Sequence, residues 1–209
     1  MKKIFVQFIV MIISAVSFGQ NFEGKITYQN NYTSKIPGAT SEQLSLMMGD
    51  KQEFFIKDSN YKSTLNGSML QWQLFESGTN KLYTKMSGSE TLLWNDAGVN
   101  DDEIIKTEIN KNVIEVLGYR CDELILTCKN AVQKFYFNSQ LAVDAAIFAN
   151  HKYGNWYDVI SRSNALPLKS IIENPQFTLV STATMVMPMK LEKSFFELPA
   201  NSKSEKSPY

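Results

Sequence analysis

Residues 69–86, MLQWQLFESGTNKLYTKM, hold two short runs of alternating apolar and polar side chains, separated by a turn segment. In the first run Leu70, Trp72 and Leu74 share one face, and two glutamines share the other. A period of two is typical of a half-buried β-strand, because successive side chains of a strand point to opposite faces. Residues 77–80, SGTN, supply turn chemistry between the runs. The stretch therefore predicts two adjacent antiparallel strands.

The same rhythm continues in both directions along the chain. The further strand-like runs are FEGKITYQ (22–29), QEFFIKDS (52–59), YKSTLNG (61–67), ETLLWND (90–96), EIIKTEI (103–109), NVIEVLGY (112–119), CDELILTC (121–128), VQKFYFN (132–138), LPLKSIIE (166–173), FTLVSTATMVMPM (177–189) and LEKSFFELP (191–199). We expect about ten or eleven strands from these runs, in a mainly β protein built on an antiparallel meander. A meander of this length does not stay flat, so it splits into a sandwich or curls into a barrel.

Two segments break the strand rhythm and predict helices. Residues 41–49, SEQLSLMMG, have Thr40 or Ser41 as an N-terminal cap and Gly49 as a stop. Three apolar residues of this segment share one helical face at spacings i, i+3 and i+4: Leu44, Met47 and Met48. The second segment, residues 139–164, has an Ala-rich centre that favours helix, with an interruption at Gly154-Asn155. Helices inserted into a meander suit an incomplete, or half, β-barrel whose open mouth they cover as a lid.

The two ends of the chain differ from the middle. Lys2 and Lys3 precede a short apolar run that ends in small residues, which predicts a cleaved signal peptide over residues 1–19. The apolar run is shorter than the roughly 20 residues of a membrane-spanning helix, so an N-terminal anchor is the less favoured alternative. We expect one domain over 20–200, a flexible polar tail over 201–209, and a periplasmic or secreted protein.

The charge and composition of the chain limit the classes of partner that it can bind. The chain has 21 basic and 21 acidic residues, and loss of Lys2 and Lys3 leaves 19 against 21, a net charge of −2. This balance gives no electrostatic footprint for nucleic acid. No cysteine follows the N-terminal apolar run, so the sequence offers no site for lipid attachment there, and no later apolar run has spanning length. We expect a monomer.

Several short motifs resemble one known family. Residues 114–121, IEVLGYRC, are similar to an I-x-G-Y-K/R-C segment, and the early FEGKITY strand, ALPLK (165–169) and FFELP (195–199) look like further landmarks in the same order. They resemble uncharacterised exported proteins of Gram-negative bacteria, which are similar to LolA-like outer-membrane lipoprotein-sorting proteins. The resemblance covers nearly the whole mature chain, although each motif is short. It implies an incomplete antiparallel β-barrel whose helices cover an apolar cavity for acyl chains, and it implies no established activity.

Polar chemistry is sparse in the sequence. His151 is the only histidine, and Asp144 and Asp158 lie at a distance from it along the chain. A zinc site needs several ligands at constrained spacing, so these residues do not favour one. A Ser-His-Asp triad stays open, because its members need not be near in sequence, but no G-x-S-x-G motif occurs. The acidic run at residues 101–103 lacks the calcium-loop pattern and is interpreted as a solvated turn. We therefore expect no enzyme activity, no metal and no cofactor.

The apolar inventory is richer, with thirteen Phe, nine Tyr, three Trp and nine Met. Met and aromatic side chains can line a wide, deformable ligand cavity, although for any one residue a place in an ordinary core is the stronger expectation. The candidate cavity residues are Leu44, Met47, Met48, Leu70, Trp72, Leu74, Phe135, Phe137, Ile147, Phe148 and Trp156.

The sequence is compatible with two functions from different classes. The leading hypothesis is a periplasmic carrier that buries a lipid, a lipoprotein acyl chain or another hydrophobic ligand behind a lid formed by 41–49 and 139–164. The alternative is a structural or protein-interaction module of the cell envelope, in which side chains fill the barrel and a surface or open edge binds an envelope protein.

The two cysteines, Cys121 and Cys128, lie in one predicted strand. Seven residues of extended chain separate their Cα atoms by about 23 Å, whereas a disulfide tolerates no more than about 7 Å. Their odd spacing also places the two side chains on opposite faces. We predict two free thiols, with Cys121 buried and Cys128 near the tip of a hairpin.

Overall fold

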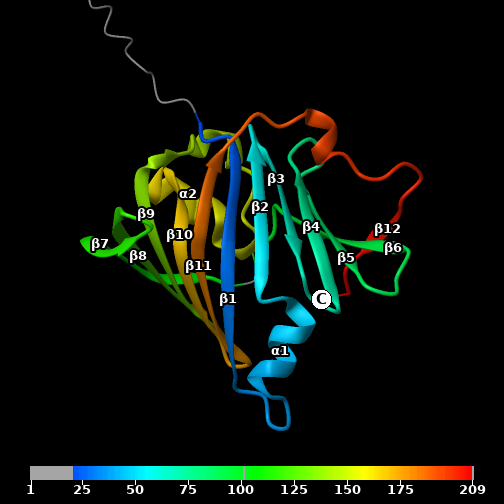
Figure 1. Ribbon diagram of the computed structural model, residues 1–209, viewed down its shortest axis with the longest axis horizontal. Helices are drawn as coiled ribbons and strands as arrows, with labels where there is room; N and C mark the ends of the chain where they lie inside the picture. Colours follow the sequence, from blue (N-terminus) through cyan, green and yellow to red (C-terminus); the bar gives the residue numbers. More distant parts are fainter. Residues whose placement is uncertain (1–20, 101, 209) are drawn as a thin grey trace, which may run out of the picture.

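The computed structural model describes residues 21–100 and 102–208, in which twelve strands form a single sheet (Figure 1). The strands are β1 (Gly24–Ser34), β2 (Lys51–Lys57), β3 (Asn60–Leu65), β4 (Leu70–Glu76), β5 (Lys81–Met86), β6 (Thr91–Asp96), β7 (Ile104–Val116), β8 (Tyr119–Cys128), β9 (Val132–Ala142), β10 (Ala165–Glu173), β11 (Phe177–Pro188) and β12 (Lys203–Lys206). The mainly β character predicted from the sequence is confirmed. The predicted signal peptide, 1–19, lies outside the described residues.

The sheet combines two meanders. Its order is β12-β6-β5-β4-β3-β2-β1-β11-β10-β9-β8-β7. The strands β1 to β6 follow one another, as do β7 to β11, and β1 joins the two sets by pairing antiparallel with β11. Within the described part of the chain, β12 alone runs parallel to its neighbour, which is β6. The free edges of the sheet are therefore β12 and β7.

The connection between β6 and β7 forces the sheet to curl. These strands lie ten positions apart in the sheet order, yet only residues 97–103 join them. A flat sheet with strands about 4.8 Å apart would hold them roughly 48 Å from each other. The connecting chain, fully extended, reaches at most about 29 Å. The sheet is therefore an open, strongly curved one, consistent with the expected incomplete barrel.

Residues 143–164, called the insertion below, lie inside this curl. They contain η1 (Ala145–Phe148), η2 (Tyr153–Asn155) and α2 (Trp156–Ser163). The carbonyl oxygen of Ala97, in the β6–β7 connection, accepts hydrogen bonds from Lys152 N at 2.6 Å and Tyr153 N at 3.0 Å. Asn100 Nδ2 also donates to Asn155 Oδ1 at 2.6 Å. The insertion thus bridges the part of the barrel wall where strands do not pair.

The helix α1 (Ser41–Met48) has the ends that the sequence predicts. Thr40 Oγ1 accepts from Gln43 N, and Gln43 Oε1 accepts from Thr40 N, which is a capping box. Gly49 ends the helix at a φ of 94°, a value that side chains disfavour. Figure 1 shows α1 at the lower end of β1 and β2, and none of its residues is buried.

Four segments differ from the sequence-based prediction. EIIKTEI and NVIEVLGY form one strand, β7, with an irregular register between Asn110 and Ile114 instead of a turn. Residues 139–142, expected to be helical, continue β9 because Ala142 pairs with Ala165 at the start of β10. These two changes lengthen strands at the expense of loops and helix.

The other two differences concern the C-terminus. LEKSFFELP, expected to be a strand, contains the short helix η3 (Lys193–Phe196), which lies across β3 and β4. The expected flexible tail over 201–209 includes a strand, β12, whose backbone pairs with β6 from Lys203↔Thr91 to Lys206↔Trp94. Backbone pairing with an available sheet edge, and not apolar side chains, orders this polar segment.

The two faces of the sheet are named here by what covers them. The inner face packs against the insertion, and its buried side chains include Ile26, Phe54 and Phe75. The outer face carries Leu74 and other residues that pack against the chain around η3. Among the described residues, no helix combines the length and the apolarity that a membrane crossing requires.

Candidate functional site

The inner face is centred on a histidine inside an aromatic cluster. His151 is 1% exposed, its ring centroid lies 4.1 Å from that of Phe75, and its Nε2 lies 2.7 Å from the Tyr61 hydroxyl. Burial lowers the pKa of His151 to about 4, because a charged imidazole would lose its hydration there. Trp156 and Phe148 complete the cluster, with ring centroids 6.0 Å apart. His151 Nε2 is therefore paired with a side chain, the Tyr61 hydroxyl, and not with solvent.

This cluster packs the contact between the insertion and the sheet. Phe148 is 1% exposed, and Ile147 and Trp156 pack against the same buried cluster. Two polar atoms in it have no hydrogen-bond partner among the described residues: His151 Nδ1 and Trp156 Nε1. Orphaned buried polar groups are rare and costly, so the contact between the insertion and the sheet is imperfect at this point.

A second inner cluster contains Phe135 and Phe137 of β9. Both are buried, and both belong to the group that includes Val159 of α2. The helix α2 thus seals this part of the inner face with its own side chains. Five of the candidate cavity residues lie on the inner face or in the insertion, as parts of a packed core: Phe135, Phe137, Ile147, Phe148 and Trp156.

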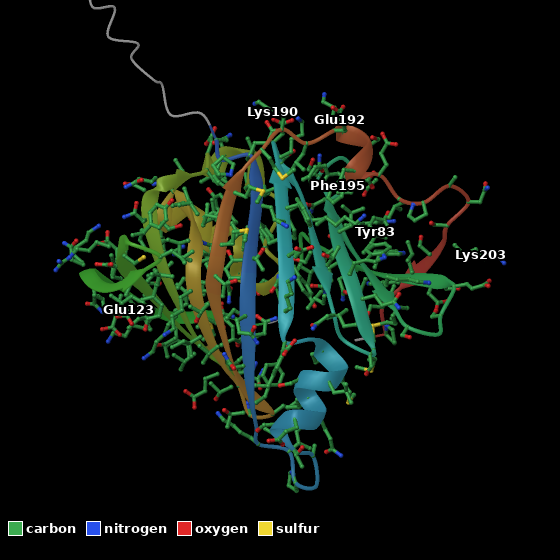
Figure 2. All side chains as sticks on the ribbon, in the orientation of Figure 1. Tyr83, Glu123, Lys190, Glu192, Phe195 and Lys203 are labelled. Carbon is green, nitrogen blue, oxygen red and sulfur yellow. The ribbon has the colours of Figure 1, made fainter. Side chains whose placement is uncertain are left out.

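Trp72 and Leu74 lie on the outer face instead. Their cluster includes Tyr83 of β5 and Phe195 of the η3 segment, and Figure 2 shows Tyr83 and Phe195 in the same region of the molecule. Lys62 Nζ lies 5.4 Å from the Trp72 ring centroid and 4.9 Å from that of Phe195, and desolvation lowers the pKa of this lysine. The outer face therefore has its own aromatic cover.

The remaining candidates sit at the end of the sheet. Leu44 and Met48 of α1 are half-buried, Met47 is 38% exposed, and Leu70 is buried at the start of β4. The backbone carbonyl of Met47 accepts a hydrogen bond from Met69 N at 3.0 Å, which ties the end of α1 to the loop before β4. The structure does not bring the eleven candidates together into one pocket.

Two hollows of the structure are open grooves on its surface. One of about 450 Å³ lies beside α1 and is lined by Asn31, Tyr32, Ser41, Glu42, Ser45, Leu46, Asp50 and Asn66. Another of about 490 Å³ has a mainly polar lining, to which Arg120, Asn138 and Arg162 contribute; Phe137 is the one candidate residue that borders it. Among the residues described, no group of three or more metal-ligating side chains gathers.

A feature that the sequence reasoning missed is the free edge at β7. This strand spans 13 residues and has β8 as its neighbour, and Figure 1 shows it at the left margin of the molecule. Ile105 is 70% exposed, Ile109 is 45% exposed and Val113 is 43% exposed. A long edge strand with exposed apolar side chains is a ready template for pairing with another chain. The spacing of these residues at every fourth position was the available signal.

The ladder between β7 and β8 is regular in two runs, of which residues 106–110 form the longer one. Pairs run without a break from Lys106↔Thr127 to Asn110↔Glu123, and irregularities flank this run. At the second irregularity Asn112 has a φ of 56°, and its backbone N–H donates to Asp122 Oδ1 at 2.9 Å. A β-bulge of this kind bends an edge and discourages pairing beyond it. The longest regular edge is therefore residues 106–110, and Ile105 adjoins it at the first irregularity.

Both cysteines lie on β8, as the sequence predicts for a continuous strand. Cys121 and Cys128 are free thiols, and both are buried. Burial raises the pKa of Cys128 to about 11, with a further contribution from the charge of Asp102. The same cause raises the pKa of Cys121. These environments suit inert packing, not thiol chemistry.

The comparisons with known proteins give distant likenesses. No protein-family model and no curated protein matches the chain. Two crystal structures of PNGF-II align with TM-scores of 0.48 and 0.47 at 14% identity, over 89% of this chain but only 32% and 31% of theirs. LprF from Mycobacterium bovis aligns with a TM-score of 0.32 at 8% identity, over 80% of this chain and 89% of LprF. By its own strand order this chain is a mainly β, open-sheet protein, and the family suggested by its motifs stays a prediction.

Proposed function

We propose that this chain is a non-enzymatic binding protein of the cell envelope that docks an extended segment of protein against the free edge of β7. The observation that carries the proposal is the exposure of Ile105 and Ile109 on a strand with a single described neighbour, β8. An extended chain laid along such an edge gains backbone hydrogen bonds, and its side chains meet those of the edge strand. The predicted signal peptide, 1–19, would bring the protein to the envelope.

The packing of the inner face supports this choice over a permanent ligand cavity. The aromatic side chains around His151 and the residues of α2 occupy the space between sheet and insertion. Recognition at the exterior requires no rearrangement of this core. The β7 edge can bind a partner while side chains fill the barrel. A filled barrel is what the alternative hypothesis, a protein-interaction module, assumes.

The test is site-specific photo-crosslinking in the producing cell. A benzophenone amino acid replaces Ile105 in one variant, Ile109 in a second and Leu46 of α1 in a third. Leu46 is the matched control, because it is an apolar residue with 68% exposure against 70% for Ile105. We expect a discrete protein adduct from positions 105 and 109 and none from position 46. No adduct at 105 and 109, or equal adducts at all three positions, would overturn the proposal.

A second candidate, the carrier of a lipid or other hydrophobic ligand, is favoured by one observation. His151 Nδ1 and Trp156 Nε1 are buried without hydrogen-bond partners where the insertion meets the sheet. Lifting the insertion would expose both atoms to water and uncover apolar side chains of the inner face. The insertion alone would then be the lid, since α1 lies at the end of the sheet.

Native mass spectrometry and organic extraction test this carrier function on protein purified from a membrane-containing host. A carrier retains lipid and binds a fluorescent fatty acid, and Trp156→Phe, which removes one orphaned donor, should tighten the closed form and weaken binding. Protein that holds no lipid and leaves the probe unbound would eliminate the carrier function and leave the edge as the candidate site.

A further inference from the structure

We propose that the segment docked on β7 is β7 of a second copy of this chain, paired antiparallel about a two-fold axis that passes between the two Thr107 residues. This inference rests on the proposed function, because it names the partner of the same edge. It replaces the monomer expected from the sequence.

Symmetry restricts how β7 can pair with itself. An isologous dimer has a two-fold axis, and antiparallel pairing of adjacent edges in a continuous sheet places this axis perpendicular to the sheet. Such a rotation keeps each side chain on its own face. A residue can then oppose only residues of the same parity, because alternate side chains point to opposite faces. The allowed registers are those centred on a residue, not between two residues.

The register centred on Thr107 matches side chains on both faces. On one face Ile105 of each copy opposes Ile109 of the other, so two exposed apolar pairs lose contact with water. On the other face Lys106 opposes Glu108, again twice. Lys106 and Glu108 already lie on one face of the single chain, with Nζ and Oε1 3.0 Å apart. Directly opposed apolar pairs and opposite charges both stabilise neighbouring strands.

The neighbouring registers are worse. Centring on Lys106 or on Glu108 places two like charges directly opposite each other, which is destabilising. Centring on Ile109 removes every Lys–Glu pair and requires the irregular stretch beyond Asn110 to pair. The bulge at Asn112 thus favours the register on Thr107, because it ends the regular edge at residue 110.

The apolar face of the proposed β7–β7 interface is continuous with a buried cluster of the single chain. Thr107 pairs with Leu126 and Ile109 pairs with Leu124, so these β7 side chains lie on the inner face beside two fully buried leucines. Ile104, which lies beyond the first irregularity of the ladder, already packs against that cluster. A second copy would therefore extend a buried apolar layer across the edge, and not cover an isolated patch.

Charge reversal tests the partner and the register together, by sedimentation velocity on the mature chain over a range of concentrations. We expect the wild-type chain to dimerise. Lys106→Glu and Glu108→Lys each place like charges opposite each other at two points, and each should weaken the dimer by about tenfold or more. An equimolar mixture of the two variants restores both opposed pairs, and it should recover the wild-type dimer as a heterodimer.

Lys203→Glu is the matched control, because Lys203 is an exposed lysine on β12, the other edge of the sheet. Figure 2 shows Lys203 far from Glu123 of β8, the strand next to β7. This control should dimerise as the wild type does. A monomeric wild-type chain, a mixture that stays monomeric, or equal weakening by Lys203→Glu would overturn the second-copy inference. Cellular adducts from positions 105 and 109 to a different protein would then uphold the proposed function while this inference fails.

Discussion

The Nε2 atom of His151 lies 2.7 Å from the hydroxyl of Tyr61, a residue ninety positions earlier in the chain. The imidazole and phenol rings are nearly parallel, with an interplanar angle of 12°. This contact joins the insertion to β3 in the middle of the inner face. It fixes a titratable group where water does not reach, and stability should therefore depend on its protonation.

The pH dependence of unfolding should reveal this histidine. Its folded pKa of about 4 lies below the unfolded value of 6.5, so the unfolded state binds the proton more readily. Stability is then complete above pH 6.5 and falls as pH drops from the unfolded toward the folded pKa. We expect a loss of about 1.3 kcal/mol between about pH 7.5 and about pH 5.5. Urea unfolding at a series of pH values measures it.

The control for this prediction is His151→Gln, which removes the only histidine of the chain. Its free energy of unfolding should be lower than that of the wild type at neutral pH and nearly level down to about pH 5.5, above the range in which carboxylates titrate. An unchanged slope in His151→Gln would show that another group causes it.

Glu23 should hold the start of the C-terminal segment. Its carboxylate accepts hydrogen bonds from Lys57 Nζ at 2.9 Å, Lys190 Nζ at 3.0 Å and Leu191 N at 2.7 Å. The Lys57 bond first, then the Leu191 and Lys190 bonds, lower the pKa of Glu23 to about 2. This contribution is present above the unfolded pKa of 4.5 and is lost as pH falls through 2. Glu23→Gln should weaken these contacts at neutral pH.

Limited proteolysis measures the effect as faster cleavage within 189–198. Glu197→Gln is the comparison, because it removes a carboxylate from the same segment without touching the three donors. Equal cleavage rates in the two variants would contradict a specific role for Glu23.

Phe148→Ala should leave a void in the inner core. Phe148 is 1% exposed and packs between the sheet and Trp156, so truncation removes buried apolar contacts. We expect a loss of about 3–5 kcal/mol in the free energy of unfolding, measured with denaturant. Phe148→Leu, which keeps much of the volume, should cost less. Equal and small losses from both variants would mean that the side chain does not fill the core.

Cys128 should react slowly with alkylating agents in the folded state. The thiolate is the reactive species, and burial raises the pKa of this thiol to about 11. Iodoacetamide labelling at about pH 8, followed by peptide mass mapping, should show little modification of Cys128 until denaturant is added. Rapid labelling of the folded chain would place Cys128 at an accessible surface.

Local patterns predicted much of the fold. Alternation located most strands, and the Thr40 and Gly49 caps fixed the ends of α1, because strand pleat and helix capping depend on neighbours in the chain. CDELILTC formed the unbroken strand that its residues indicate. The half-buried pattern of MLQWQLF was correct as well, although it did not reveal which side of the sheet would bury Trp72 and Leu74.

The candidate site was harder to predict, because the identity of an apolar side chain does not reveal which residues it will pack against. Trp72 and Phe195 pack against one cluster, while Phe148 belongs to another, and the two clusters lie on different faces of one sheet. Only the curl of the sheet and the path of the C-terminal segment separate them. The alternation of β7 was visible, but its position at an edge depends on which strands find partners.

The sequence by itself determined a mainly β chain with interrupted meanders, the capped helix over 41–48, and two cysteines too far apart along one strand to bond with each other. Tertiary structure decided the order of the strands, the filling of the inner face by the insertion, and the exposure of β7. The physical reason is range: periodicity and capping act over a few residues, whereas β1 meets β11, and Tyr61 meets His151, only after the whole chain has curled.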